Sequence, residues 1–144
     1  MLMMANFFQN TGMISSGMLH VSPKETYKLC RQGANMVDVR EEYMNRFKMF
    51  DVDKVIFCPF SILEENYQDF PKDKALIFAD AAGLRSKEAV SFLKNKGYEN
   101  IANMAGGLVE WERDGLPLKI DKSERLSGSC ACMLRKRKKN QQSK

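Results

Sequence analysis

The sequence predicts an α/β domain built on a mostly parallel sheet, and three observations lead to this fold class. Residues 75–79 form a short, uninterrupted apolar run, which is typical of a strand buried on both faces of a parallel sheet. A helical period follows from Arg85, with Ala89, Val90 and Leu93 on one face. Strand-like and helix-like segments also alternate along the chain, as they do where helices connect parallel strands.

The first elements are marked by helix start and stop signals. Residues 1–17 show no periodicity and are expected to form a flexible lead before the domain. Ser22 is the predicted N-cap of the first helix, with Pro23 at its first position and Glu25 at its third, as in a capping box. Gly33 is placed to end this helix.

The remaining elements follow from short apolar or amphipathic segments between turn residues. Pro59 ends the third predicted strand, and Gly97 ends the longest predicted helix. Strands are expected at residues 18–21, 36–39, 54–57, 74–79 and 100–104. Helices are expected at residues 23–32, 41–47, 61–67, 85–96 and 108–113.

Length and charge divide the chain into one domain and two ends. The 144 residues, 44% of them hydrophobic, are enough for one domain at 18–120, followed by a flexible basic tail at 121–144. Residues 122–144 hold eight Lys and Arg against one Glu, a charge of +7, so the +5 of the whole chain leaves −2 elsewhere. Attraction to nucleic acid would therefore depend on the tail alone, and no specific nucleic-acid binding is expected.

No apolar run approaches the roughly 20 residues that span a bilayer. The N-terminus also lacks the basic start of a signal peptide. We therefore expect a cytoplasmic protein without a membrane span, whose four cysteines are mostly reduced. The sequence leaves the oligomeric state open.

The loop at 80–86 is the predicted ligand-binding feature. It runs from the carboxyl end of a strand to the amino end of a helix, where backbone N–H groups lack partners within the helix. Such a loop is a ready cradle for an anion, and Gly83 can adopt the positive φ that a tight turn needs. The residues of this anion cradle are Asp80, Ala81, Ala82, Gly83, Leu84, Arg85 and Ser86.

Four motifs stand in a fixed order along the chain. Residues 80–86 follow the pattern x-x-x-Gly-x-Arg-Ser, residues 36–43 contain Asp-Val-Arg-Glu, residues 97–101 read Gly-Tyr-Glu-Asn-Ile, and residues 106–117 contain Gly-Gly, Trp and Gly-Leu-Pro. Together they resemble the rhodanese-like sulfurtransferases, whose active-site loop is Cys-x-x-Gly-x-Arg-Ser. The resemblance covers residues 19–118 and implies a single rhodanese-like domain, a five-stranded sheet flanked by helices on both faces.

The chain departs from the family at the nucleophile, because Asp80 stands where the family has its Cys. Sulfur transfer needs a thiolate that holds sulfur as a persulfide, and a carboxylate forms none. We expect Asp80 to sit in the cradle as a built-in anion that accepts N–H bonds, so that the loop keeps its shape and loses its chemistry. Arg85 is expected to pair with Asp80. Ser86 is expected to cap the helix. Asp38 and Arg40 are expected to form a structural hydrogen bond or ion pair near the end of the sheet.

Other uses of Asp80 are disfavoured. An aspartyl phosphate would need Mg²⁺ and further carboxylates nearby, which Ala81 and Ala82 do not supply. An anionic partner would be repelled by the fixed charge of Asp80. The only histidine, His20, lies near the first strand, so a His-assisted nucleophile is not expected either. No cofactor and no metal are expected.

The cysteines offer another route to thiol chemistry. Cys30 and Cys58 are expected to be buried. Cys130 and Cys132 stand in the tail beside the basic run 135–139, where positive charge lowers a thiol pKa and raises its reactivity. This Cys-x-Cys pair could accept sulfur, form a strained disulfide or bind a soft metal with ligands from a partner. A solvated tail whose thiols have no special role also stays open.

The residues favour a rhodanese-like protein that is not catalytic through its loop. We expect it to act as a binding or regulatory module in sulfur metabolism, with a protein partner or a sulfur carrier as its ligand. The alternative is a thiosulfate or persulfide sulfurtransferase, or a thiol-redox protein, that works through Cys130 or Cys132.

Overall fold

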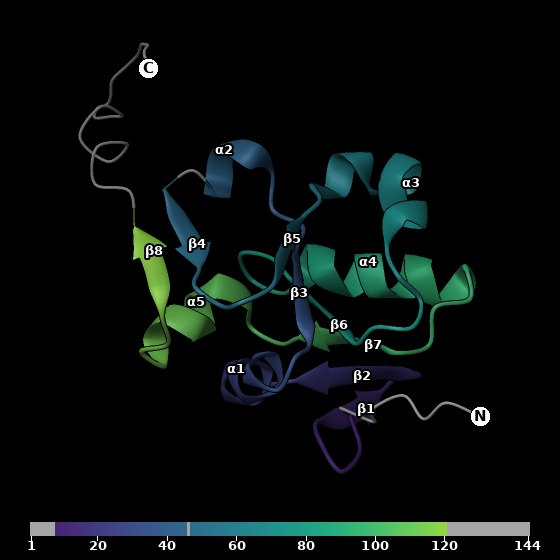
Figure 1. The fold of residues 1–144 in the computed structure, drawn as a ribbon, viewed down its shortest axis with the longest axis horizontal. Coiled ribbons are helices and arrows are strands. Elements are labelled where there is room, and N and C mark those ends of the chain that lie inside the picture. The colour runs from purple at the N-terminus through teal and green to yellow at the C-terminus, as the bar shows by residue number, and fades with distance from the viewer. Residues whose placement is uncertain (1–7, 46, 121–144) are drawn as a thin grey trace.

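A six-stranded sheet forms the centre of the molecule in the computed structural model, which describes residues 8–45 and 47–120 (Figure 1). All neighbouring strands are parallel except the first pair. From one edge to the other, the strands are β1 (Met13–Ser15), β2 (Met18–Val21), β7 (Ile101–Met104), β6 (Leu76–Ala79), β3 (Asn35–Asp38) and β5 (Val55–Phe57). The predicted α/β fold class is confirmed, with a mixed sheet.

The predicted count of five strands is one too low, because β1 forms within the segment that the sequence assigns to a lead without periodicity. β1 pairs antiparallel with β2 across a turn in which Ser16 and Gly17 both have positive φ, 54° and 74°. Two positive φ values match the twist of a tight hairpin. All three residues of β1 are exposed. Because neither face of this strand is buried, the alternation of apolar and polar residues that marks a half-buried strand is missing from its sequence.

The helices cover both faces of the sheet. On one face, α1 (Pro23–Arg31) packs against α5 (Gly107–Arg113). On the other, α4 (Leu84–Asn95) packs against β6, β7 and η1 (Phe60–Ile62). The remaining helical pieces are α2 (Glu42–Asn45), α3 (Leu63–Asn66) and a 3-10 turn, η2 (Tyr67–Asp69). No helix in the described part of the chain is both long and apolar enough to cross a bilayer.

A small second sheet was not predicted. It pairs β4 (Lys48–Phe50) with β8 (Leu118–Ile120), antiparallel, so that Lys48 faces Ile120. The helix predicted at 41–47 is therefore shorter, because the chain has turned into β4 by residue 48. Each strand has only three residues and finds its partner far along the chain, so no local pattern marks either one.

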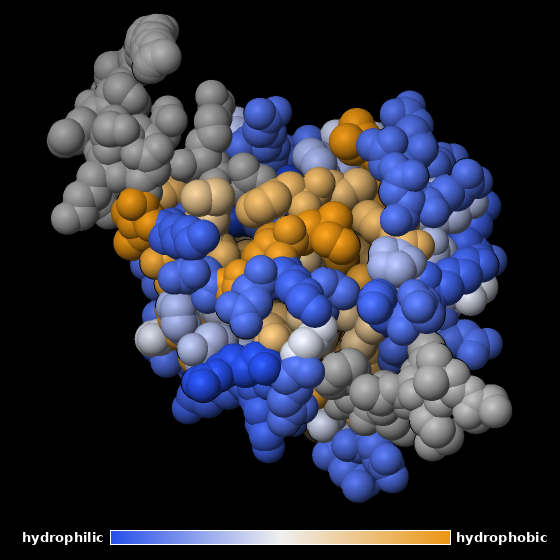
Figure 2. All heavy atoms as spheres, viewed as in Figure 1, coloured by the Kyte–Doolittle hydropathy of each residue, from blue (hydrophilic) through white to orange (hydrophobic). Residues whose placement is uncertain are grey.

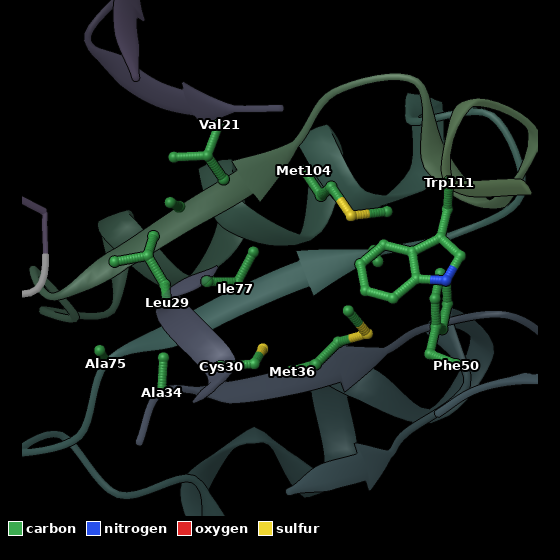
Figure 3. Close-up of a cluster of buried hydrophobic side chains, with 12 residues drawn as sticks. Val21, Leu29, Cys30, Ala34, Met36, Phe50, Ala75, Ile77, Met104 and Trp111 are labelled. Carbon is green, nitrogen blue, oxygen red and sulfur yellow. The ribbon is translucent and has the colours of Figure 1, made fainter. Parts of the chain in front are cut away.

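Strand β6 organises the core by burying side chains on both faces. All four of its residues are buried, as the uninterrupted apolar run predicts. Leu76 and Phe78 belong to the cluster beneath α4, whereas Ile77 and Ala79 belong to the cluster beneath α1 and α5. The second of these clusters is shown in Figure 3, where the fully buried Trp111 closes one end.

The start of α1 is a complete capping box, which confirms the prediction. The Glu25 N–H donates to Ser22 Oγ at 3.1 Å, and the Ser22 N–H donates to Glu25 Oε1 at 2.8 Å. Cys30 and Cys58 are 2% and 4% exposed, which confirms that both are buried. Burial raises the pKa of Cys30 to about 12 and also raises the pKa of Cys58.

Candidate functional site

The predicted anion cradle is a tight loop between β6 and α4, and its anion is supplied by Asp80. The Asp80 side chain turns back into the loop and accepts hydrogen bonds from the backbone N–H groups of Gly83 and Arg85, the latter at 2.7 Å. Gly83 precedes α4 with a φ of 96°, which a residue with a Cβ rarely adopts. Because Asp80 is only 5% exposed, these N–H groups are used inside the protein.

The start of α5 holds the other side of the loop. The N–H groups of Leu108 and Val109 donate to the carbonyl oxygens of Asp80 and Ala81, at 2.8 and 3.1 Å. A Cβ on Gly107 would lie 2.5 Å from the Ala81 carbonyl group, so the contact requires glycine. The Gly-Gly motif thus has a structural role: it lets the backbone of α5 approach the loop.

Two expectations for the rest of the loop are wrong. The Arg85 guanidinium lies over the Phe60 ring, 5.2 Å from its centroid, and forms no ion pair with Asp80. The Arg85 backbone, not its side chain, binds the carboxylate. Ser86 does not cap α4; its fully buried hydroxyl donates to Asn103 Oδ1.

Asn103 belongs to a polar chain that sequence reasoning missed. It is 1% exposed in β7 and contacts His20 Nδ1 through its Nδ2 at 3.1 Å. Ser86, Asn103 and His20 therefore link the start of α4 to β2 through the interior. A polar residue within a buried strand was the available signal, because a buried amide needs hydrogen-bond partners.

Asp38 and Arg40 form a buried ion pair behind the loop, which confirms the structural role predicted for them. Arg40 Nη2 lies 2.8 Å from Asp38 Oδ2, and both side chains are almost fully buried. The same guanidinium also donates to the carbonyl oxygens of Met44 and Lys48, at 3.3 and 2.8 Å. Through these hydrogen bonds and the ion pair, Arg40 connects α2 and β4 to the end of β3.

A cleft of about 300 Å³ lies between the loop and α2. Asp80, Arg40 and Phe60 are among its lining residues. Tyr43 and Leu84, each 67% exposed, stand at its mouth. Figure 2 shows apolar surface in the middle of this face, near the start of α4 and below α2. The cleft therefore presents apolar groups around a carboxylate that is already hydrogen-bonded.

Thiols and metal-binding clusters are absent from this cleft as far as the structure describes it. Neither Cys30 nor Cys58 lines it, and their raised pKa values keep both thiols protonated near neutral pH. Residues 8–45 and 47–120 contain no group of three His, Cys, Asp or Glu side chains that could hold a metal ion. Cys130, Cys132 and the basic run 135–139 lie outside the described residues.

Comparisons with known proteins point to one protein family. The family model described as a rhodanese-like domain matches residues 22–114. The thiosulfate sulfurtransferase GlpE of Haemophilus influenzae is 30% identical over 102 residues, which cover 68% of this chain and 91% of that protein. The tRNA uridine(34) hydroxylase of Bdellovibrio bacteriovorus is 26% identical over 103 residues, which cover 66% of this chain and 29% of that protein.

A solved structure supports the same conclusion. The rhodanese-related protein of Thermoplasma volcanium superposes with a TM-score of 0.65 at 28% identity, covering 71% of this chain and 98% of that one. The family model matches more than half of the sequence, and its boundaries enclose the anion cradle, the Asp38–Arg40 pair and the Gly-Gly turn of α5. This chain is therefore a member of the rhodanese-like domain family.

Proposed function

We propose that this protein does not transfer sulfur through its loop and acts instead as a binding or regulatory module in sulfur metabolism. One observation carries the proposal: the Asp80 carboxylate stands at the family's nucleophile position and accepts the N–H bonds of Gly83 and Arg85. In a sulfurtransferase, those N–H groups would be available to stabilise a thiolate or a persulfide.

The chemistry of a carboxylate supports the same proposal. A sulfur atom must be held by a nucleophile that forms a bond with it and later releases it, which a cysteine thiolate does and a carboxylate does not. The two cysteines of the described domain are buried with raised pKa values, so neither replaces the missing nucleophile in the folded state.

The cleft supports a macromolecular ligand. Its mouth exposes the ring of Tyr43 and the side chain of Leu84, and apolar groups of this kind suit contact with another protein segment. We therefore propose a protein partner or a protein-borne sulfur carrier as the ligand. A cytoplasmic location with reduced cysteines remains our prediction.

The second candidate function is sulfur transfer or redox chemistry through Cys130 or Cys132. The observation in its favour is the Cys-x-Cys pair followed by five consecutive basic residues, a setting that favours thiolates. Intact mass spectrometry of the reduced protein after incubation with thiosulfate separates the two functions. We expect no added sulfur. A sulfur atom that maps to Cys130 or Cys132, and that cyanide removes, would establish the second function instead.

Restoring the nucleophile tests whether Asp80 alone prevents transfer. We expect Asp80→Cys to gain thiosulfate:cyanide sulfurtransferase activity at least about tenfold above Asp80→Ser, because the loop N–H groups are already in place. The measurement is thiocyanate formation, with the fold of both variants checked by circular dichroism. A folded Asp80→Cys protein as inactive as Asp80→Ser would mean that the loop has diverged beyond its nucleophile.

A further inference from the structure

The cleft beside Asp80 lies next to the point where the described chain ends. Ile120, the last residue of β8, faces Lys48 of β4. The Lys48 carbonyl oxygen accepts a hydrogen bond from Arg40 at 2.8 Å, and Arg40 lines the cleft. One strand pairing and one hydrogen bond therefore separate the start of the tail from the cleft wall.

The tail has the length and composition to enter this cleft. Its 24 residues contain apolar side chains only between residues 126 and 134, and these are Leu126, Cys130, Ala131, Cys132, Met133 and Leu134. They begin six residues beyond Ile120, and an extended chain spans about 3.3 Å per residue. Six to fourteen residues thus reach roughly 20–45 Å.

Three of the four charged residues that line the cleft are already paired or hydrogen-bonded, and the guanidinium of the fourth, Arg85, lies over the Phe60 ring, so the rest of the cleft favours an apolar occupant. Arg40 is paired with Asp38, and Asp80 is bonded to the loop N–H groups. Glu41 accepts hydrogen bonds from the backbone N–H of Ser61 at 3.1 Å and from its hydroxyl at 2.9 Å. What the cleft offers is the exposed surface of Tyr43, Met44 and Leu84.

Acidic residues outside the lining of the cleft, on α2 and on α3 next to η1, are opposite in charge to the basic run at 135–139. Glu42 on α2 and Glu64 and Glu65 on α3 are exposed, and none of them forms an ion pair within the described residues. Figure 1 shows β8 and β4 on one side of α2, and α3 on the other. A tail that leaves β8 and passes the cleft therefore brings its basic run toward these carboxylates.

We infer that residues 126–134 fold back into the cleft beside Asp80, so that the chain is its own first ligand. This inference rests on the proposed function, in which the same cleft receives a protein segment. A partner must displace the tail before it binds, and displacement exposes Cys130 and Cys132.

Alkylation of the full chain tests this placement. N-ethylmaleimide is applied at fixed pH, and the rate at each cysteine is mapped by peptide mass spectrometry. We expect Cys130 and Cys132 to react roughly tenfold more slowly in the native chain than in urea, as millimolar effective concentration and a segment affinity of about 0.1 mM would give. Equal rates in both states would overturn the inference.

A matched pair of variants locates the protection. Leu84→Ser removes an aliphatic side chain from the mouth of the cleft, whereas Ile14→Ser removes one of similar exposure, 74% against 67%, from β1 at the far edge of the sheet. We expect faster alkylation of Cys130 and Cys132 only in Leu84→Ser. Slow alkylation of the buried Cys30 verifies that each variant is folded. Equal effects of the two substitutions would contradict the placement.

Dilution and sulfur uptake separate the remaining outcomes. Protection that disappears on dilution would assign the tail to a second copy of the chain and overturn the intramolecular arrangement. Thiols that are unprotected while thiosulfate adds no sulfur would end this inference and leave the proposed function intact. Protected thiols in a protein that takes up sulfur would end the proposed function and leave this inference intact.

Discussion

At the scale of the residue, Asp80 supplies the internal hydrogen bonds that hold its own loop together. Its carboxylate accepts two backbone N–H bonds at the start of α4, where a negative charge is also favoured by the helix dipole. These contacts hold the loop closed from within the chain. The Asp80 side chain is therefore a stabilising part of the loop.

Replacing Asp80 with alanine should lower the free energy of unfolding by about 2 kcal/mol. The reason is the loss of a charged acceptor for the N–H groups of Gly83 and Arg85. Urea unfolding measures the change. Asp73→Ala, at an exposed turn position, is the control and should stay within about 0.5 kcal/mol of the parent protein. An Asp80→Ala variant with an unchanged free energy of unfolding would mean that water replaces the carboxylate as hydrogen-bond acceptor without loss of stability.

At the scale of the element, the position of the loop depends on α5. The first N–H groups of this helix bind the carbonyl oxygens of Asp80 and Ala81, so two elements that are distant in sequence define one backbone surface. Gly107 permits their contact, with a φ of 61° and no room for a Cβ. The loop is therefore held in position by a helix as well as by its own turn.

Gly107→Ala should destabilise the protein by about 3 kcal/mol or more, since its Cβ would lie 2.5 Å from the Ala81 carbonyl group. The matched control is Gly115→Ala, at the other end of α5. Gly115 also has a positive φ, 73°, but a Cβ there would meet no atom within 4 Å, so a loss of only about 1 kcal/mol is expected. Thermal or urea unfolding of the two variants gives the comparison, and equal losses would show that backbone conformation alone matters.

At the scale of the whole molecule, the two core clusters hold ionisable groups in their neutral form. Burial raises the pKa of Cys30 to about 12, and it also raises the pKa values of Cys58 and Tyr98. The native state therefore keeps protons that the unfolded chain releases in alkaline solution. The contribution of these groups to the free energy of unfolding is fully present below about pH 9 and is lost as the pH rises toward 12.

The free energy of unfolding should accordingly fall between pH 7.5 and pH 10.5. Cys30 alone accounts for about 2 kcal/mol of this decrease, because its pKa in the unfolded chain is near 9. Urea midpoints at the two pH values measure the effect. Cys30→Ala should be less stable at pH 7.5 and should show a shallower alkaline decrease. An equally steep decrease in that variant would assign the effect to other groups.

The sequence predicts elements whose signal is local. The capping box at Ser22 and the apolar run of β6 each lie within a few residues, and both are found as expected. β1, β4 and β8 are not predicted because β1 depends on a tight turn, and β4 and β8 depend on each other across a long stretch of the chain.

In the candidate site, too, only the features that depend on a local motif are predictable. The position of Asp80 in the loop follows from the family motif, and so does the proximity of the Arg85 backbone. The direction of the Arg85 and Ser86 side chains does not follow, because Phe60 and Asn103 reach them from other elements. Side-chain partners are set by tertiary packing, which no short motif contains.

The environment of Trp111 allows unfolding of the domain to be followed by its intrinsic fluorescence. This residue is the only tryptophan in the chain, it is fully buried, and its indole Nε1 donates to the Pro117 carbonyl oxygen at 2.8 Å. The Phe50 ring meets it edge-on, with centroids 5.2 Å apart. Unfolding moves this indole from an apolar site into water, so its fluorescence emission shifts to longer wavelength. Variants of the loop and of α5 can thus be compared by intrinsic fluorescence, without a label that would consume a thiol.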